Sequence, residues 1–342
     1  MKDESVAERS ARLLAPVRAT LSRFEQEADT PVLAGPWLGE VGFELLYWIP
    51  FLRWAVSEFP GLRRQLVIQS RGGVASWYEG LATRYVDLFD HFSLRTFRDR
   101  FGKFFKQTDT YDGYTKTPGL RSYSDAEQEI VDLVRREAGA TRLNVLHPSV
   151  MYGAFKHIQG SREREFAEYF PQLARPPVSG LEIELPDQFI AVRFYECFPF
   201  PASEANRAFV WELVTHLTKT LPIVCLNTGM PIDRKHPDFP LEDIDTVVSA
   251  KESMTLANNL AVQSVIIGQA NAFLGSYGGL SYLPPLFGRP SFSLYSDGRS
   301  LSKTSHLALA QSVLARPRLG GYWVGSVAEM TPRAVADAVL TS

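Results

Sequence analysis

The stretch NAFLGSYGGLSYLPPLFGRPSF, residues 271–292, joins an apolar run to a helical pattern through a turn that contains two adjacent glycines. The run 272–277 has the composition of a buried strand, and the apolar spacing of 280–287 indicates a helix. The next apolar run, 290–295, predicts another strand. A strand, a glycine turn, a helix and a second strand in this order are typical of parallel α/β structure.

The same alternation of short apolar runs and helical patterns extends in both directions, and the Pro- and Gly-containing segment 175–180 separates two such series. The expected strands are 31–37, 65–70 and 143–147 before this segment, and 189–194, 222–227, 246–249, 272–277 and 290–295 after it. The expected helices are 6–27, 43–59, 125–137, 205–220, 253–263, 280–287 and 332–340. We therefore predict an α/β fold class with two facing Rossmann-like domains, residues 1–178 and 179–342, and a ligand cleft between them. The last helix, 332–340, is expected in the second domain or packed back on the first.

Length and composition restrict the class of protein. A chain of 342 residues exceeds the size at which a single core usually stops growing, in agreement with two domains. The formal net charge of −2 argues against a protein that binds nucleic acid. The two cysteines, Cys197 and Cys225, are not spaced as metal ligands. Without a signal-peptide pattern or an apolar run of roughly 18 residues, we expect a cytoplasmic protein with, at most, peripheral membrane contact.

The glycine turn of the second domain is the first candidate site. Backbone N–H groups and the helix dipole at the start of a helix favour phosphate, and the two serines add hydroxyl donors. The residues expected to bind phosphate are Ser276, Tyr277, Gly278, Gly279 and Ser281. The alternative is an ordinary strand-to-helix turn without a ligand.

Two other strand ends of the second domain carry polar residues. Arg193 ends the strand 189–194, where a guanidinium can offset the charge of a diphosphate with two parallel hydrogen bonds. Its alternative role is a structural salt bridge with Glu196 or a neighbour. The next strand is followed by Asn227, Thr228 and Gly229, which are expected either to contact a nucleotide or to form a plain turn.

Residues 189–295 resemble the carboxyl-terminal half of GT-B glycosyltransferases. The resemblance lies in the strand 271–276, the glycine and serine turn, the helix that follows, and the run LFGRP at 286–290 that leads into the next strand. The pattern is most similar to bacterial surface-polysaccharide and fucosyltransferase-like enzymes, although their His-x-Arg motif is absent. The resemblance implies transfer of a sugar from a nucleotide-sugar donor to a hydroxyl of a glycan, a lipid-linked or a small-molecule acceptor, as in polysaccharide biosynthesis.

The resemblance also indicates how the leaving diphosphate is stabilised. In GT-B enzymes a cation such as Arg193 and a helix start serve in place of a metal ion, so we expect neither a metal nor a cofactor. Neither half contains G-x-G-x-x-G, which disfavours a dinucleotide-dependent dehydrogenase. Two alternatives on the same scaffold are a nucleotide-sugar epimerase and a non-catalytic protein that binds a nucleotide or a glycan.

Transfer to a hydroxyl requires a base that accepts the proton of the acceptor. In several inverting GT-B families this base is a carboxylate in the loop after the first strand, and here that loop contains Glu40 and Glu44. Glu40 matches the family position better, whereas Glu44 falls inside the expected helix, where its charge is explained by solvation or the helix dipole. His147, at the end of the strand 143–147, is the third candidate, with a structural histidine as its alternative.

The segment 95–106 alternates basic residues with phenylalanines. Arg98 and Lys103 are the residues expected to contact an anionic or lipid-linked acceptor, or an anionic membrane surface. The alternative is an amphipathic helix whose phenylalanines face the core.

Overall fold

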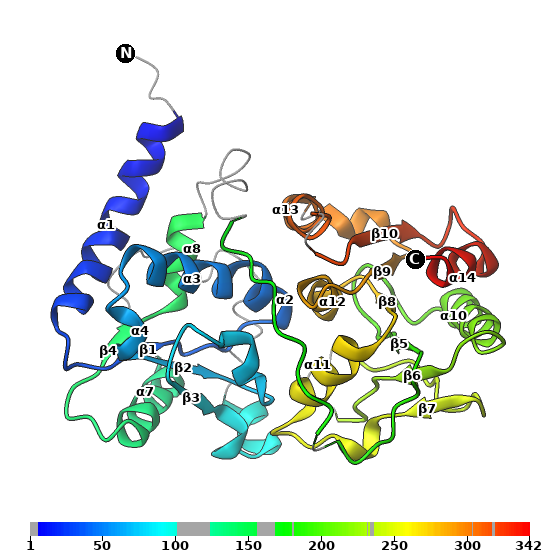
Figure 1. Ribbon diagram of the computed structural model, residues 1–342, viewed down its shortest axis with the longest axis horizontal. Helices are drawn as coiled ribbons and strands as arrows, with labels where there is room; N and C mark the ends of the chain where they lie inside the picture. The colour runs from blue at the N-terminus through cyan, green and yellow to red at the C-terminus, as the bar shows by residue number, and fades with distance from the viewer. Residues whose placement is uncertain are drawn as a thin grey trace. The chain divides into compact units, whose positions relative to one another are not determined.

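The computed structural model describes residues 6–100, 124–155, 168–179, 181–230, 232, 236–302, 304–316 and 319–342. The chain divides into two compact units, Met1–Phe170 and Pro171–Ser342, each with its own parallel sheet (Figure 1). The division falls ahead of the boundary expected after residue 178.

The sheet of the first unit has four parallel strands in the order β3-β2-β1-β4. These strands are β1 (Val32–Ala34), β2 (Leu66–Ser70), β3 (Arg84–Asp87) and β4 (Asn144–Leu146). The helical elements are α1 (Val6–Gln26), α2 (Val41–Phe43), η1 (Glu44–Trp48), α3 (Ile49–Glu58), α4 (Leu62–Gln65), η2 (Val74–Tyr78), η3 (Leu88–Asp90), α7 (Asp125–Glu137) and α8 (Pro148–Phe155).

The sheet of the second unit has six parallel strands in the order β10-β9-β8-β5-β6-β7. These strands are β5 (Ile190–Arg193), β6 (Ile223–Cys225), β7 (Val247–Ser249), β8 (Ala272–Ser276), β9 (Ser291–Tyr295) and β10 (Tyr322–Ser326). The helical elements are α10 (Glu204–Leu217), η4 (Lys251–Ser253), α11 (Asn259–Gln269), η5 (Gly279–Tyr282), α12 (Leu283–Leu286), η6 (Gly298–Ser302), α13 (Thr304–Leu314) and α14 (Pro332–Leu340).

The strand order reverses once in each sheet. From β1 the chain adds β2 and β3 on one side and then β4 on the other, and from β5 it adds β6 and β7 before β8, β9 and β10. This order is that of doubly wound Rossmann folds, in which ligands bind at the carboxyl ends of the strands beside the point of reversal. The predicted α/β class with two Rossmann-like units is confirmed. The ligand cleft between them stays a prediction.

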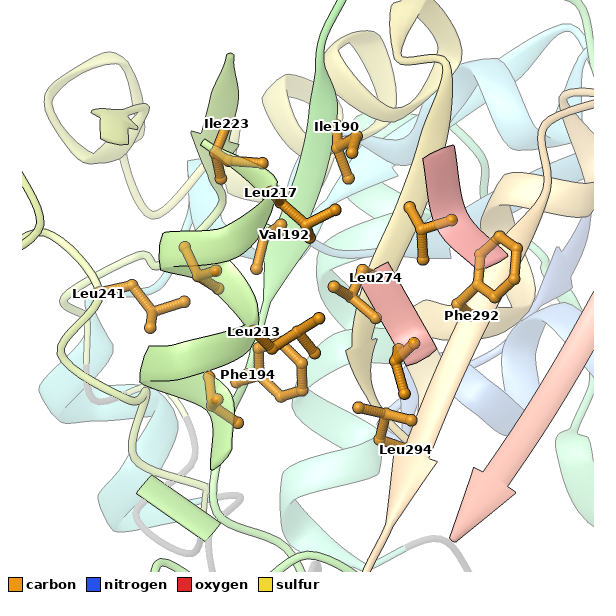
Figure 2. Close-up of a cluster of buried hydrophobic side chains, with 14 of the residues drawn as sticks. Ile190, Val192, Phe194, Leu213, Leu217, Ile223, Leu241, Leu274, Phe292 and Leu294 are labelled. Carbon is orange, nitrogen blue, oxygen red and sulfur yellow. The ribbon is translucent and has the colours of Figure 1, made fainter. Parts of the chain in front are cut away.

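The core of the second unit forms between its sheet and two helices (Figure 2). Residues Ile190, Val192 and Phe194 follow the two-residue period of a strand and pack with the inner face of α10. Helix α14 packs against α10 and contributes Val335, Ala336 and Val339 to the same core. The sequence allowed this helix to pack on the first domain instead. In the structure its buried residues belong to the core of the second unit.

The structure corrects several expected elements. Strands β3 and β10 and helices α8 and α13 were not expected, and α11 begins at Asn259 instead of residue 253. The single helix expected over 43–59 is divided by the π-helical turn η1, in which the N–H of Ile49 donates to the carbonyl of Glu44. Such turns insert one residue into a helix and occur often at functional sites.

Candidate functional site

Polar residues gather at the carboxyl edge of the second sheet, on both sides of its point of reversal. Arg193 is the last residue of β5 and lies in register with Gly275 of β8, directly before the glycine turn. The structure therefore brings together two of the regions that the sequence singled out separately, the arginine and the turn at 276–281.

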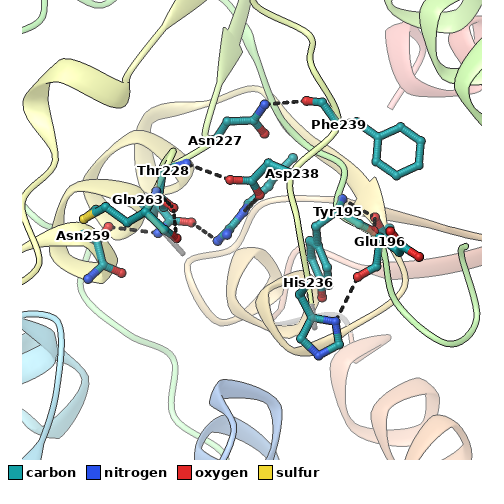
Figure 3. A network of polar contacts seen from close by, with 12 residues as sticks. Tyr195, Glu196, Asn227, Thr228, His236, Asp238, Phe239, Asn259 and Gln263 are labelled. Atoms are coloured by element: carbon teal, nitrogen blue, oxygen red, sulfur yellow. Dashed lines mark hydrogen bonds and ion pairs between the residues drawn. The ribbon is translucent and has the colours of Figure 1, made fainter. Parts of the chain in front are cut away.

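Arg193 is fixed by contacts with three residues, Asp238, Gln263 and Tyr195, which are labelled in Figure 3. Its Nε donates to Oδ1 of Asp238 at 3.2 Å, and its Nη1 donates to Oε1 of Gln263 at 2.7 Å. The guanidinium carbon lies 5.5 Å from the centre of the Tyr195 ring. The ion pair that the sequence allowed with Glu196 is formed with Asp238 instead. The orientation of the guanidinium is set by these neighbours.

Asp238 also ties the end of β6 to this network. Its Oδ2 accepts a hydrogen bond from the backbone N–H of Thr228 at 3.0 Å, while Nδ2 of Asn227 donates to the carbonyl of Phe239 at 2.6 Å. The turn ends with Gly229, which is exposed and has φ +60°. The side-chain amide of Asn227 is thus used within the unit, and its Oδ1 is buried without a hydrogen-bond partner among the described residues.

The glycine turn is held by the serines that were expected to bind phosphate. Ser276 Oγ accepts from the N–H of Tyr195 at 2.8 Å and donates to its carbonyl at 2.9 Å. Ser281 Oγ donates to the carbonyl of Gly278 at 2.7 Å. Both hydroxyls therefore shape the turn. The other polar groups of the turn are the backbone N–H groups at Gly278 and Gly279 and the hydroxyl of Tyr277.

Tyr277 is oriented by a second tyrosine. The Tyr282 hydroxyl donates to the Tyr277 oxygen at 3.1 Å, so the proton of Tyr277 is not used in this bond. Burial raises the pKa of Tyr277, which keeps this hydroxyl protonated and able to donate. A protonated hydroxyl beside the glycine turn is a suitable donor for a phosphate oxygen.

In the first unit, Glu44 is a fully buried carboxyl at the carboxyl edge of the sheet. Its Oε1 accepts hydrogen bonds from Ser70 Oγ and from the Tyr78 hydroxyl, each at 2.5 Å. Its Oε2 is buried without a hydrogen-bond partner among the described residues. Burial raises the pKa of Glu44, although the charge of Arg71 and the two hydrogen bonds oppose the shift. The alternative of a solvated surface charge is wrong for this residue.

Glu40 differs from Glu44 in its surroundings. It is exposed and precedes α2 with an extended backbone, φ −73° and ψ 153°. The turn that carries it is tied to the end of β2, because Nη2 of Arg71 donates to the carbonyl of Gly39 at 2.7 Å. Of the two carboxylates after β1, Glu40 is the one that is exposed to solvent.

Two residues beside Glu44 were not among the predicted site residues. Asp87, at the end of β3, accepts hydrogen bonds from the N–H of Gly73 at 2.7 Å and from the Tyr85 hydroxyl at 2.9 Å, and burial raises its pKa. Arg71 directly follows β2. Arg71 could have been identified from the sequence, because the run Arg71-Gly72-Gly73 directly follows an apolar strand.

His147 lies directly after β4, on the other side of β1, and both of its ring nitrogens have partners. The N–H of Ser149 donates to Nδ1 at 3.1 Å, so Nδ1 is an acceptor and Nε2 carries the proton. Nε2 lies 3.0 Å from Oε1 of Glu127. Burial would raise the pKa of Glu127, but the hydrogen bond from His147 contributes to a net lowering. This geometry matches the structural histidine that the sequence left as an alternative.

The basic and aromatic segment lies partly outside the described residues, and Lys103 is among those outside. Residues 94–100 are helical, and Phe97 is buried against Phe89 with ring centres 5.0 Å apart. This part is thus the amphipathic helix that the sequence allowed. Nε and Nη2 of Arg98 are buried and have no hydrogen-bond partner in the described part of the chain. Acceptor contact by Arg98 and Lys103 stays a prediction.

The chain has one D-x-D tripeptide beside the second sheet, Asp243-Ile244-Asp245, whose two carboxylates are exposed just before β7. Within the described ranges, no group of three or more His, Cys, Asp or Glu residues is arranged to hold a metal ion. No helix in those ranges has the length and apolar character required to cross a membrane.

The sequence matches no protein-family model and no curated protein. The structure is similar to E. coli heptosyltransferase WaaC with ADP, at 13% identity and a TM-score of 0.45, covering 91% of this chain and 99% of that one. It is also similar to a glycosyl transferase family 9 protein from Veillonella parvula, at 11% identity and a TM-score of 0.45, covering 92% and 98%. A UDP-GlcNAc 2-epimerase from Methanocaldococcus jannaschii has 9% identity and a TM-score of 0.29, covering 99% and 83%.

Proposed function

We propose that this chain is a glycosyltransferase that moves a sugar from a nucleotide-sugar donor to a hydroxyl acceptor. The observation that carries the proposal is the fixed guanidinium of Arg193 beside the glycine turn, at the point where the order of the second sheet reverses. Ligands of doubly wound sheets bind at this place. A cation and unpaired backbone N–H groups are the chemistry that stabilises a departing diphosphate.

The proposed reaction requires charge stabilisation of the leaving group, which we assign to the second unit, and a base for the acceptor proton, which we assign to the first. The acceptor oxygen attacks the anomeric carbon, the bond from this carbon to the phosphate oxygen breaks, and the electron pair leaves with the nucleoside diphosphate. Arg193 and the N–H groups at Gly278 and Gly279 offset the negative charge of this leaving group. The exposed carboxylate of Glu40 takes the proton of the acceptor hydroxyl. Transfer without a metal ion is part of the proposal.

Nucleotide binding is tested first by thermal shift with ADP, GDP, UDP, CMP and dTDP, each with and without EDTA. ADP is included because it is named with the E. coli heptosyltransferase structure above. A ligand that binds only the folded chain raises its Tm, by the equivalent of about 2.7 kcal/mol at 100 times Kd. A shift with one nucleotide that persists in EDTA supports the proposal, and no shift with any of them contradicts it.

The second experiment separates a transferase from the other classes. The sugar donor of the nucleotide that binds is incubated with the chain, and release of nucleoside diphosphate is followed with and without candidate acceptors. A transferase releases diphosphate in proportion to new glycoside. Interconversion of the donor sugar without release would identify an epimerase, and binding without any turnover would identify a binding protein.

A further inference from the structure

Phe198 is a large apolar side chain that is exposed to solvent. It is 87% exposed, whereas the other exposed large apolar side chains of the described residues, Val178 and Trp211, are 43% and 44% exposed. Phe198 follows β5 by five residues and thus belongs to the loop at the carboxyl edge of the second sheet, where Arg193 also lies.

The backbone around Phe198 is fixed. Cys197 and Phe200 exchange both backbone hydrogen bonds, at 3.1 and 3.0 Å, so Phe198 and Pro199 form the tip of a closed turn. The carbonyl of Pro199 accepts from the N–H groups of Ser296 at 2.8 Å and Asp297 at 3.1 Å. The pyrrolidine ring also restricts the backbone at the tip. A backbone that is already held in one conformation loses little further conformational entropy when a ligand binds.

This turn lies next to the groups proposed to bind the diphosphate. The Cys197 thiol donates to the carbonyl of Tyr277 at 3.5 Å, and Tyr277 directly precedes the glycine turn. On the other side, Glu196 lines a small hollow of about 40 Å³ together with Arg207 and Asp238. A carboxylate there repels phosphate but accepts hydrogen bonds from ribose hydroxyls, as acidic residues do in nucleotide-binding sheets.

We propose that Phe198 is the stacking platform for the nucleobase of the donor. A bare phenyl ring has no hydrogen-bonding group, so what it offers is a flat apolar face, and every nucleobase presents a complementary face. With the diphosphate at the glycine turn and the ribose toward Glu196, the base meets a surface that is already in place. This inference rests on the proposed function, because it assumes that the second unit binds a nucleotide.

The test measures the affinity of the full chain and of Phe198→Ala by calorimetry, for the nucleoside diphosphate found in the thermal-shift panel and for the corresponding nucleoside. Both affinities are expected to fall about 5- to 150-fold, which corresponds to the ~1–3 kcal/mol of one base stacked on an aromatic side chain. Phe198→Trp should retain affinity for both ligands. Trp211→Ala removes another exposed aromatic ring of the same unit, from α10, and should leave both affinities unchanged.

Each adverse result has its own meaning. Unchanged affinity of Phe198→Ala for both ligands overturns the stacking role and leaves nucleotide binding intact. A loss confined to the nucleoside diphosphate, with the nucleoside bound as tightly as by the unmodified chain, assigns the ring to the phosphates and also overturns the proposal. If the unmodified chain binds none of the nucleotides, the proposed function and this inference both fail. The Tm of each variant, measured without ligand, shows whether a loss of affinity reflects unfolding.

Discussion

Arg193 is the residue whose removal gives the most specific test of the diphosphate site. Arg193→Ala should weaken binding of the nucleoside diphosphate by about 10- to 150-fold, the ~1.5–3 kcal/mol of a hydrogen bond to a charged group. Binding of the nucleoside should change much less, because the guanidinium is proposed to contact the phosphates. Calorimetry with both ligands measures the difference.

The control for Arg193 must account for its structural partners. Removal of the guanidinium leaves Asp238 and Gln263 without their bond to it, so some loss of Tm is expected. Arg193→Lys keeps the charge but lacks the planar fork that holds two partners at once, and should be intermediate for the diphosphate. An equal loss of affinity for nucleoside and diphosphate would remove Arg193 from the phosphate site.

Glu44 predicts a dependence of stability on pH. Its folded-state pKa is raised above the ordinary value of 4.5, so the folded chain holds this proton more tightly than the unfolded chain does. The stability from Glu44 is therefore fully present below about pH 4.5 and is lost as the pH rises through the raised pKa. Glu44→Gln cannot ionise. The Tm of this variant relative to the unmodified chain should increase as the pH is raised from acid toward neutral.

The quantity to measure is the difference in Tm between Glu44→Gln and the unmodified chain at each pH. Burial also raises the pKa of Asp87, but both proteins share that contribution, so the difference does not contain it. Ser76→Ala, at an exposed position of the same unit, removes no ionisable group; it is the control and should give a difference that does not vary with pH. A pH-independent difference for Glu44→Gln as well would show that Glu44 titrates as an ordinary carboxyl.

At the scale of elements, the contact between β5 and β8 depends on two glycines. A Cβ at position 275 would lie 2.2 Å from the backbone carbonyl oxygen of Arg193, and one at position 278 would lie 1.8 Å from the Tyr195 hydroxyl oxygen. Backbone in a sheet cannot move aside, whereas the end of a side chain can. Gly275→Ala should therefore lower the Tm more than Gly278→Ala, with about 1–3 kcal/mol expected for an overpacked site.

Two further variants check this explanation. Gly298→Ala adds a Cβ at 3.6 Å from the Tyr295 ring, an ordinary contact distance, and should change the Tm little. Tyr195→Phe removes the atom nearest to position 278 and leaves the next at 2.9 Å, so it should relieve part of the cost of Gly278→Ala. Equal losses at positions 275 and 278 would argue against the backbone contact as the cause.

Elements with local signals were predictable from the sequence. Helix α14 has the expected limits because Thr331 caps it and Pro332 occupies its first turn. Helix α7 has the expected limits because Ser124 and Glu127 form a capping box at its start. Helix α11 was placed six residues too early. Its buried residues surround the helix, so the sequence shows no apolar stripe that would mark its limits.

The candidate site was predictable only in part, for a related reason. Arg193 was identified because it ends an apolar strand, which is a local pattern. Its partners Asp238 and Gln263 lie 45 and 70 residues away in the chain, and no local pattern marks them. The π-helical turn that places Glu44 in the interior also has no sequence signature, so its burial could not be distinguished from the exposure of Glu40.

At the scale of the whole molecule, the proposed reaction is divided between two units that each have a core and a polar edge of their own sheet. Donor binding is assigned to the second unit and proton transfer to the first. This division predicts that variants fall into two groups. Changes at Arg193 or Phe198 should act on donor affinity, and changes at Glu40 should act on turnover at saturating donor.

Glu40→Gln is the variant that tests this division, because it keeps the shape of the side chain and removes its basicity. As the proposed general base, Glu40 should contribute about 10²–10⁴-fold to the rate, so kcat for transfer should fall by that factor. Donor affinity and Tm should stay close to those of the unmodified chain, since Glu40 is exposed and lies in the other unit from the proposed donor site. Calorimetry, thermal unfolding and initial rates on the same preparations provide the three measurements.

Glu44→Gln is the companion variant, since the carboxyl of Glu44 is fully buried whereas that of Glu40 is exposed. It should lower kcat less than Glu40→Gln does. Near-normal turnover by Glu40→Gln, with Glu44→Gln inactive but folded, would move the base to the buried residue. If both variants retain turnover, His147 becomes the candidate base.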